Sequence, residues 1–336
     1  MNSAGQERVC MSATPYRQAD WWFENENGNT QIRHETSDDD LFSAKMTSPP
    51  PIDERLTDQI QTALFMVGYE IEERLDDHTN SHVYRARRLS TGAAVAVKVL
   101  VEHPQDVSSA VRRFRQEARL MTTLHHPNLV RALAHGCLHG VHYAILELAE
   151  GRNLRSVVQS DGPLSIDRAA NVIWQTANVL EYLHQRGVIH RDVKPSNLVL
   201  CRDGRVKLLD LGLARAPVPA DTSITLLFDD RLLGTPDFMA PEQALECHLV
   251  DARADLYALG CTLYYLLTGR PPIMGRNLLQ SLLGHQNAQP TPVSTLRSDV
   301  PAELQDICAK LMAKRPCDRY ETAAEVADVL ACWALK

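Results

Sequence analysis

Glycine and positive charge are both scarce in this sequence. Its 336 residues include 16 glycines, whereas an average usage near 7% would give roughly 24. Lys and Arg number 35 against 42 Asp and Glu, so the formal net charge is −7. Domains dedicated to nucleic acid are normally basic. The composition therefore argues against a nucleic-acid partner, while a hydrophobic content of 44% is enough for a sizeable core.

Paired cysteines and long apolar runs are absent as well. The eight cysteines form no C-x-x-C pair, which favours reduced thiols in a cytoplasmic protein over a secreted disulfide scaffold. The stretch from Met1 to Trp22 lacks the basic and apolar regions of a signal peptide. The longest apolar run, Leu256–Thr268, is too short to cross a bilayer. We therefore expect a cytoplasmic protein with no membrane segment in this chain.

The acidity is concentrated at the N-terminus. Residues 1–68 hold 11 acidic and 5 basic side chains, so most of the net charge lies there. Asn, Ser, Asp and Glu dominate residues 1–55, and Pro49–Pro51 closes that stretch. Such a composition is typical of a disordered segment. We predict an acidic, largely disordered tail over residues 1–68, in which Leu56–Val67 has the spacing of a short helix.

From Tyr69 onward, short β-rich segments are followed by longer segments of helical period. The predicted strands are Tyr69–Leu75, His82–Arg88, Ala93–Val101, Leu129–Ala134 and Val141–Leu148, with a helix over Val107–Leu124. The later predicted helices are Asn153–Gln159, Ile166–Arg186, Ala252–Thr268, Ala302–Ala313 and Thr322–Leu335. This order predicts an α+β fold with a small β-rich lobe over residues 69–150, a larger helical lobe over 151–336, and a cleft between them.

A single lysine interrupts one of the apolar strands. Lys98 follows Val95, Ala96 and Val97, and a lysine in such a strand is costly to bury unless it is paired. Glu117 in the following helix is a candidate partner. Two interpretations are open: a structural ion pair, or a lysine that the glutamate orients to hold phosphate oxygens.

The segment His190–Asn197 packs four ionisable side chains and an amide between apolar neighbours. A polar surface turn would account for such a segment. The functional alternative involves Asp210, which follows another apolar strand. If the two strands are adjacent, Asn197 and Asp210 could together bind Mg²⁺, which prefers oxygen ligands.

These motifs occur in the order found in one family. They are followed by Gly234–Gln243, by Asp255–Gly260 and by a late arginine, Arg319. From about Tyr69 to Leu335 the chain resembles a eukaryotic-type (Hanks-type) protein kinase, and most resembles the serine/threonine kinases of bacteria. Several independent matches in family order are a strong signal. The resemblance implies a bilobal kinase fold and transfer of the γ-phosphate of ATP to Ser or Thr hydroxyls of protein substrates.

The resemblance also implies the catalytic residues. Asp192 would act as the general base towards the substrate hydroxyl. Lys194, at a spacing typical of serine/threonine kinases, would steady the γ-phosphate. Lys98, held by Glu117, would grip the α- and β-phosphates.

Further residues are implied for the nucleotide, the metal and the framework. The ATP-binding set would be Leu75, Val83, Ala96, Lys98, Glu147, Ala149 and Val199, with Leu146 behind the adenine. Asn197 and Asp210 would bind Mg²⁺, with Mn²⁺ as an alternative ion. Glu242 would pair with Arg319, and Asp255 would anchor the catalytic loop.

Regulation is implied by a positive charge next to the base. In kinases of this type, an arginine at the position of Arg191 typically pairs with a phosphate on the activation segment and orders that segment. Here that segment runs from Asp210 to Glu242 and offers Thr222, Ser223 and Thr225 as acceptors. Self-phosphorylation there is a hypothesis. Thr235 is expected to help set the preference for hydroxyl acceptors.

The phosphate-binding loop departs from the family pattern. The three glycine positions of G-x-G-x-x-G are Asp76, His78 and Ser81, and no glycine occurs between Gly68 and Gly92. Glycine lets a backbone approach phosphate without a Cβ, and Asp76 adds unfavourable negative charge. Because the catalytic residues remain, we expect an active kinase with altered nucleotide binding. The alternative is a pseudokinase: a scaffold that binds partners, with or without nucleotide, and transfers no phosphate.

Three histidines, His135, His139 and His142, have spacings that could suggest a metal site, but they fall around a predicted β-hairpin. Surface histidines are the expected interpretation. Cys201 and Cys261 lie in apolar runs and are predicted to be core residues. A homodimer through the small lobe is an expectation that rests on the resemblance alone.

Overall fold

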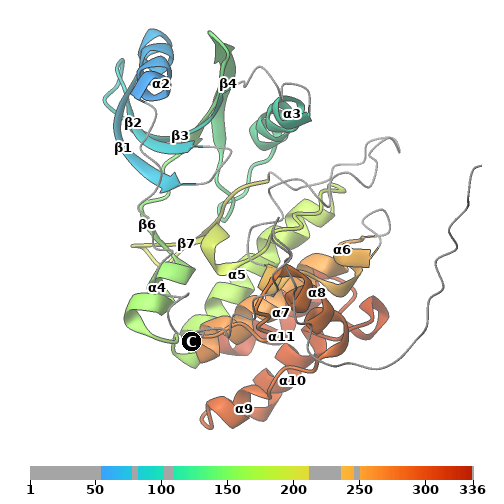
Figure 1. Ribbon diagram of the computed structural model, residues 1–336. Coiled ribbons are helices and arrows are strands. Elements are labelled where there is room, and N and C mark those ends of the chain that lie inside the picture. Colours follow the sequence, from blue (N-terminus) through green and yellow to red (C-terminus); the bar gives the residue numbers. More distant parts are fainter. Residues whose placement is uncertain (1–53, 78–81, 102–108, 212–235, 246–249, 335–336) are drawn as a thin grey trace, which may run out of the picture. The chain divides into compact units, whose positions relative to one another are not determined.

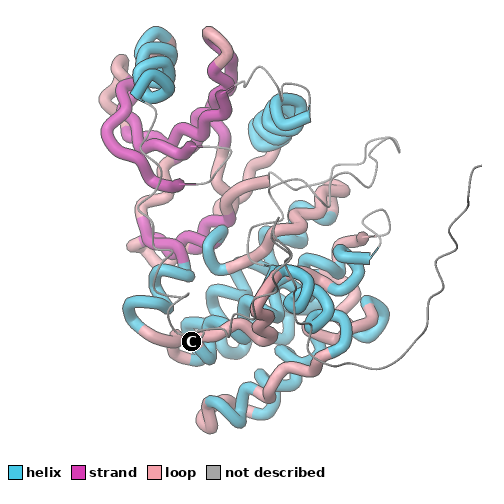
Figure 2. Tube along the Cα trace, viewed as in Figure 1, coloured by secondary structure: helices cyan, strands magenta, loops and turns pink. Residues whose placement is uncertain are grey.

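The computed structural model describes residues 54–77, 82–101, 109–211, 236–245 and 250–334 (Figure 1). Strands dominate the first part of this range and helices the remainder, as Figure 2 shows. The observed order of elements therefore matches the α+β, two-lobed organisation expected from the sequence.

The first lobe is built on a five-stranded antiparallel sheet with the order β1-β2-β3-β5-β4. Its strands are β1 (Tyr69–Asp77), β2 (His82–Arg88), β3 (Ala94–Val101), β4 (Ala132–Leu138) and β5 (Val141–Glu147). Two helices belong to this lobe, α2 (Glu54–Met66) before the sheet and α3 (Ser109–Thr123) between β3 and β4. In Figure 1, α2 lies beside β1 and β2, and α3 lies beside β4.

The two faces of β3 pack against different helices. Successive side chains of a strand point to opposite faces of the sheet. Val95, Val97 and Val99 pack into one apolar cluster with Ile60 and Leu64 of α2. The opposite face carries Ala96, Lys98 and Leu100, and Leu100 packs with Phe114 and Ala118 of α3. The alternation thus places Lys98 on the α3 side of the sheet.

Helix α2 confirms the helical spacing of Leu56–Val67 and corrects the boundary of the expected tail. Ile60 and Leu64 are 1% and 0% exposed. Because such burial ties the helix to the sheet, residues from Glu54 onward belong to the folded body. The remainder of the expected tail, residues 1–53, lies outside the described residues.

The second lobe combines a small antiparallel sheet with helices. The sheet has the order β6 (Gly151–Asn153), β7 (Leu198–Cys201) and β8 (Val206–Leu208). The helices are α4 (Leu154–Asp161), α5 (Ile166–His184), α6 (Pro241–Leu245), α7 (Arg253–Thr268), α8 (Leu278–Asn287), α9 (Val293–Leu296), α10 (Ala302–Leu311) and α11 (Ala323–Ala334). Short 3₁₀ turns lie at Pro195–Asn197, Pro236–Phe238 and Pro316–Asp318.

Helix α7 is the core of this lobe. Every residue from Ala254 to Leu267 is buried, which accounts for the apolar run seen in the sequence. A Cβ on Gly260 would lie 2.6 Å from the Cβ of Leu311, so glycine permits the close approach of α7 and α10. Among the described residues, no helix combines the length and the apolar character needed to span a membrane.

One predicted strand was misplaced. The segment expected over Leu129–Ala134 is strand β4 at Ala132–Leu138, and Gly136 lies inside it. A Cβ on Gly136 would fall 2.3 Å from the hydroxyl oxygen of Tyr143, so the glycine makes room for a cross-strand tyrosine. The turn itself is formed by His139 and Gly140, whose φ angles are 50° and 76°. Two positive φ angles in a two-residue loop are typical of a tight hairpin.

Candidate active site

Lys98 is the buried cation of the site. Its Nζ lies 2.8 Å from Oε1 of Glu117 and 2.6 Å from Oδ1 of Asp210. Lys98 and Glu117 are only 7% and 6% exposed. Burial by itself would lower the pKa of Lys98, but the two carboxylates raise it above its ordinary value. The lysine is therefore held in its charged form.

Glu117 is the counterpart of that cation on α3. Burial raises the pKa of Glu117, the Lys98 ammonium opposes the shift, and the Asp210 carboxylate adds to it. Two carboxylates thus share one ammonium group. The contact joins three elements far apart in the sequence: β3, α3 and the segment after β8.

Residues 190–197, which the kinase resemblance identifies as the catalytic loop, lie around the carboxylate of Asp192. Its Oδ1 is 2.8 Å from Nζ of Lys194, and its Oδ2 accepts a hydrogen bond of 2.8 Å from Nδ2 of Asn197. The same amide nitrogen donates to the carbonyl oxygen of Asp192 at 2.9 Å. Both carboxylate oxygens are therefore oriented, and the three residues that the resemblance implied here are in direct contact.

His190 ties this loop to the end of β8. Its Nδ1 accepts a hydrogen bond from the backbone N–H of Asp192 at 3.2 Å. Its Nε2 lies 3.0 Å from the carbonyl oxygen of Leu209 and donates to it. Since Asp210 follows Leu209, His190 couples the position of the expected base to that of the expected metal ligand.

Asp255 anchors the loop from α7. Its Oδ1 accepts from the backbone N–H of Arg191 at 2.7 Å. Its Oδ2 accepts from the backbone N–H of His190 at 2.9 Å and lies 2.8 Å from Nε2 of His184. Burial alone would raise the pKa of Asp255, but the hydrogen bond and charge of His184 and the contacts of His190 outweigh it and lower the pKa.

Asn197 and Asp210 fit a divalent cation by the type of their donor atoms and by their placement. Asn197 directly precedes β7 and Asp210 follows β8, two antiparallel strands, so both lie at the same edge of the small sheet. The backbone N–H of Leu209 donates to the carbonyl oxygen of Asn197 at 2.8 Å. Amide and carboxylate oxygens are the ligands that Mg²⁺ prefers. Asp210 adopts a left-handed φ of 55°, a conformation that aspartate tolerates and that is common at functional sites.

The residues expected around adenine are distributed over both lobes. Val83 is paired with Lys98, and Ala96 with Leu146, across neighbouring strands of the first lobe. Directly opposed residues share a face, so all four lie on the Lys98 face of that sheet. In the second lobe Val199 belongs to β7 and is buried. Leu75, two residues before the end of β1, is 46% exposed. Glu147 and Ala149 follow at the junction between the lobes and are half-buried.

Strand β1 contains the first of the three expected glycine positions, Asp76. Strand β1 runs on to Asp77, two residues beyond the predicted end at Leu75, and Asp76 is paired with Val83. A register shift lies between Arg74 and Asp76. The other two expected glycine positions, His78 and Ser81, lie outside the described residues.

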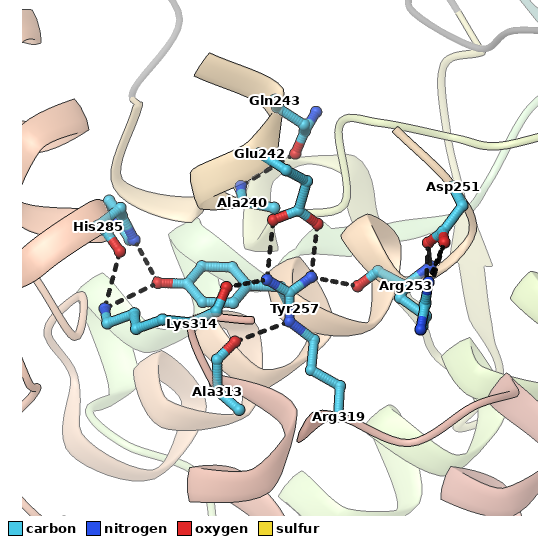
Figure 3. A network of polar contacts seen from close by, with 10 residues as sticks. All are labelled: Ala240, Glu242, Gln243, Asp251, Arg253, Tyr257, His285, Ala313, Lys314 and Arg319. Carbon is cyan, nitrogen blue, oxygen red and sulfur yellow. Dashed lines mark hydrogen bonds and ion pairs between the residues drawn. The ribbon is translucent and has the colours of Figure 1, made fainter. Parts of the chain in front are cut away.

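Arg319 is the centre of a buried network in the second lobe (Figure 3). Its Nη1 and Nη2 lie 2.6 and 2.8 Å from the two carboxylate oxygens of Glu242. The guanidinium also donates to the carbonyl oxygens of Arg253, Ala313 and Lys314 at 2.8–3.0 Å. The side chain of Arg319 is fully buried and that of Glu242 is 18% exposed. The guanidinium is therefore desolvated, and all of its N–H groups are satisfied.

Tyr257 lies beneath that guanidinium and links it to α8. The Arg319 guanidinium lies 4.8 Å from the ring centroid of Tyr257, within the range of a cation–π contact. The Tyr257 hydroxyl lies 2.8 Å from Nδ1 of His285, and Lys314 donates to the His285 carbonyl oxygen at 2.8 Å. Burial and the Lys314 charge lower the pKa of His285 to about 4, so this histidine is neutral at physiological pH.

The expected regulatory residues are described only in part. Arg191 has a left-handed φ of 65°, and its carbonyl oxygen accepts from Nε2 of Gln243 at 3.1 Å. This contact fixes the backbone next to Asp192 against α6. The acceptors Thr222, Ser223 and Thr225, and also Thr235, lie outside the described residues.

One expectation about the weaker candidates was wrong. His142 is fully buried rather than a surface histidine, because it lies on β5 against Phe114, with ring centroids 6.4 Å apart. Cys261 is a core residue as predicted, whereas Cys201 is half-buried. Within the described part of the chain, no group of three or more His, Cys, Asp or Glu side chains is arranged to hold a metal ion.

Two contributors to the site were missed. His184 supports Asp255 and could have been noticed as a histidine in the last turn of a long helix. Lys207 pairs with Glu147 at 2.6 Å. Lys207 could have been found by the pattern that identified Lys98, because it too is a single lysine between apolar strand residues.

The fold and the assembled residues define a protein kinase domain, and comparisons agree. The protein kinase domain family matches residues 69–329. Serine/threonine-protein kinase PknB of Mycolicibacterium smegmatis is 39% identical over 267 residues, which cover 78% of this chain and 42% of that protein. PknB of Mycobacterium leprae is 35% identical over 290 residues (85% and 44%). PknB of Mycobacterium tuberculosis is 37% identical over 262 residues (77% and 41%).

The chain therefore belongs to the protein kinase family, and it is similar to bacterial serine/threonine-protein kinases. It spans about two fifths of the length of the curated relatives it matches, between 41% and 44%. The two-lobed α+β kinase fold expected from the sequence is confirmed.

Replacement of Asp255 with Asn tests the anchor of the catalytic loop. An amide turns N–H groups towards backbone donors, so near neutral pH we expect the free energy of unfolding to fall by about 1–3 kcal/mol. The folded-state pKa of Asp255 lies below its ordinary 3.8. The stability from this carboxylate is therefore fully present above about pH 4 and is lost as the pH falls through the folded-state pKa. Denaturant unfolding should show the gap between wild type and variant narrowing below about pH 4.

The matched control is Asp328→Asn at an exposed position of α11. It should change the free energy of unfolding by less than about 0.5 kcal/mol at every pH. A gap between wild type and Asp255→Asn that stays constant down to about pH 3 would contradict the account.

Proposed function

We propose that this chain transfers the γ-phosphate of ATP to Ser or Thr hydroxyls of protein substrates. The observation that carries the proposal is the junction of the two lobes, where Lys98 of β3 contacts Asp210 of the second lobe at 2.6 Å. In the second lobe, Asp192 contacts both Lys194 and Asn197. A structural ion pair alone would not require this second cluster.

The proposed reaction is an in-line displacement at phosphorus. The substrate hydroxyl oxygen forms a bond to the γ-phosphorus, the bond from that phosphorus to the β,γ-bridging oxygen breaks, and ADP leaves. Asp192 accepts the hydroxyl proton on a carboxylate oxygen. Lys194, whose Nζ already contacts Asp192, balances the negative charge on the transferred group.

Binding and orientation fall to the other residues. Lys98, kept charged by its two carboxylate partners, holds the α- and β-phosphates. Asn197 and Asp210 hold the divalent ion, Mg²⁺ with Mn²⁺ as the alternative, which supplies positive charge to the triphosphate when bound. Val83 and Ala96 cover the adenine from the first lobe, and Val199 forms its floor in the second. Backbone groups of Glu147 and Ala149 bond its edge.

The alternative of a pseudokinase scaffold is not favoured. Inactive kinase folds usually lack the phosphate-binding lysine, the base or the metal-binding aspartate, and this chain keeps Lys98, Asp192, Asn197 and Asp210. The relatives that match it are named as serine/threonine-protein kinases. The loop without glycine is instead expected to weaken ATP binding, since Cβ atoms limit the approach of the backbone to phosphate.

The setting of the activity is also a proposal. We propose a cytoplasmic kinase that acts on proteins, has no nucleic-acid partner, and forms homodimers through the small lobe. The absence of C-x-x-C pairs supports the cytoplasmic setting, and the acidic composition argues against a nucleic-acid partner. The homodimer is supported by the family resemblance.

An Asp192→Asn variant tests the transfer step. The amide cannot accept the hydroxyl proton, so the rate of transfer from labelled ATP to a protein acceptor should fall by about 10²- to 10⁴-fold. Nucleotide binding, followed by the thermal shift with ATP and Mg²⁺, should remain. The matched control is Asp203→Asn in the exposed β7–β8 turn, which should transfer phosphate at the wild-type rate. A wild type that transfers no more phosphate than the Asp192→Asn variant would favour the scaffold.

Self-phosphorylation of the activation segment has its own test. We propose that phosphate on Thr222, Ser223 or Thr225 pairs with Arg191 and orders the segment. Replacement of all three acceptors with Ala should then lower the rate on an added substrate, measured after preincubation with ATP. A triple variant as active as the wild type would contradict this regulation.

A further inference from the structure

Lys207 forms an ion pair with the residue that begins the junction between the lobes. Its Nζ lies 2.6 Å from Oε1 of Glu147. The same carboxylate oxygen accepts a hydrogen bond from the backbone N–H of Arg131 at 3.0 Å. In return, the backbone N–H of Glu147 donates to the carbonyl oxygen of Arg131 at 2.9 Å. Glu147 is thus held by both its backbone and its side chain.

The lysine comes from the opposite lobe. Strand β8 has three residues, and Lys207 lies between Val206 and Leu208, which are 1% and 0% exposed. A lysine in such a strand needs a partner for its charge. The partner is supplied across the junction, so the pair connects the two lobes independently of the covalent chain from Glu147 to Gly151.

The register of the small sheet places the Lys207–Glu147 ion pair next to the proposed adenine site. Lys207 is directly opposed to Val199 of β7, and opposed residues project from the same face of a sheet. Val199 is the proposed floor of the adenine site, and the backbone of Glu147 is its proposed edge. One ion pair therefore connects the strand next to the floor with the residue that forms the edge.

We infer that Lys207 is a positioning residue for the nucleotide: by holding Glu147, it fixes the hydrogen-bonding edge of the adenine site relative to its floor. This inference rests on the proposed function, because it assumes that adenine binds between Glu147 and Val199. The effect is on binding, and it is modest because the pair is partly solvated. The two side chains are 15% and 33% exposed and line a surface hollow of about 370 Å³ together with His125, His126, Pro127 and Arg131.

The test is the affinity of the whole chain for adenosine and for a non-hydrolysable ATP analogue, measured by calorimetry with Mg²⁺. Lys207→Met should weaken both ligands by the same factor, about three- to tenfold, because the lost contact orders the adenine edge and not the phosphates. The KM for ATP should rise with kcat nearly unchanged, as expected for an interaction that acts equally in ground and transition states.

Two further variants separate positioning from mere stability. Lys207→Arg keeps a cation that can reach Glu147, and its affinity should stay within about twofold of the wild type. Glu147→Gln keeps the backbone groups of the edge and should weaken binding about as much as Lys207→Met. The double variant should add little, because both changes remove one interaction. The matched control is Arg205→Met, which breaks the exposed pair with Asp203 on the same hairpin and should bind as the wild type does.

The outcomes distinguish this inference from the proposed function. If Lys207→Met folds and binds both ligands within about twofold of the wild type, the positioning role is wrong, whatever the kinase activity. Additive losses in the double variant would overturn it as well. Should Lys207→Met fail to fold, the comparison of Lys207→Arg with Glu147→Gln decides in the same way. A wild type that binds adenosine but transfers no phosphate would refute only the proposed function, and one that binds no nucleotide would refute both.

Discussion

One buried ammonium group holds the site together. The Nζ of Lys98 contacts a carboxylate on α3 at 2.8 Å and a carboxylate of the second lobe at 2.6 Å. Without Lys98, the buried Glu117 would lose the ammonium group that opposes the rise in its pKa, and burial would favour the neutral carboxyl. Pairing with Lys98 therefore requires that α3 pack against the sheet and that Asp210 turn towards the lysine. Asp210 does so with a φ of 55°.

The second lobe repeats the same principle with different residues. Asp255 is fully buried on α7 and accepts two backbone N–H groups of the catalytic loop. Arg319 is buried against Glu242 and three carbonyl oxygens. In both cases a desolvated charge is satisfied by groups from segments distant in sequence, so the position of each segment depends on the others. The Asp255 contacts fix the backbone of His190 and Arg191, which directly precede Asp192.

The sequence revealed isolated charges well and short or tertiary features poorly. Lys98 could be found because it is the single lysine in a long apolar strand. The structure shows that it is buried together with its expected partner Glu117. Lys207 gave the same signal in a strand of three residues, too short for periodicity to be seen. Gly136 lies beyond the strand predicted over Leu129–Ala134, although it makes room for Tyr143 inside β4. The partnership of His184 with Asp255 depends on the packing of α5 against α7, which no local pattern encodes.

Lys98 is buried and charged, and we propose that its ammonium group binds the phosphates of ATP. The most direct test of this proposal compares Lys98→Met with Lys310→Met, a lysine at an exposed position of α10. Each protein is first checked for cooperative unfolding, and its rate of transfer from labelled ATP is then measured. The account predicts that the folded Lys98→Met protein loses transfer by about 10²-fold or more, while Lys310→Met keeps the wild-type rate. A folded Lys98→Met protein that transfers phosphate at the wild-type rate would contradict it.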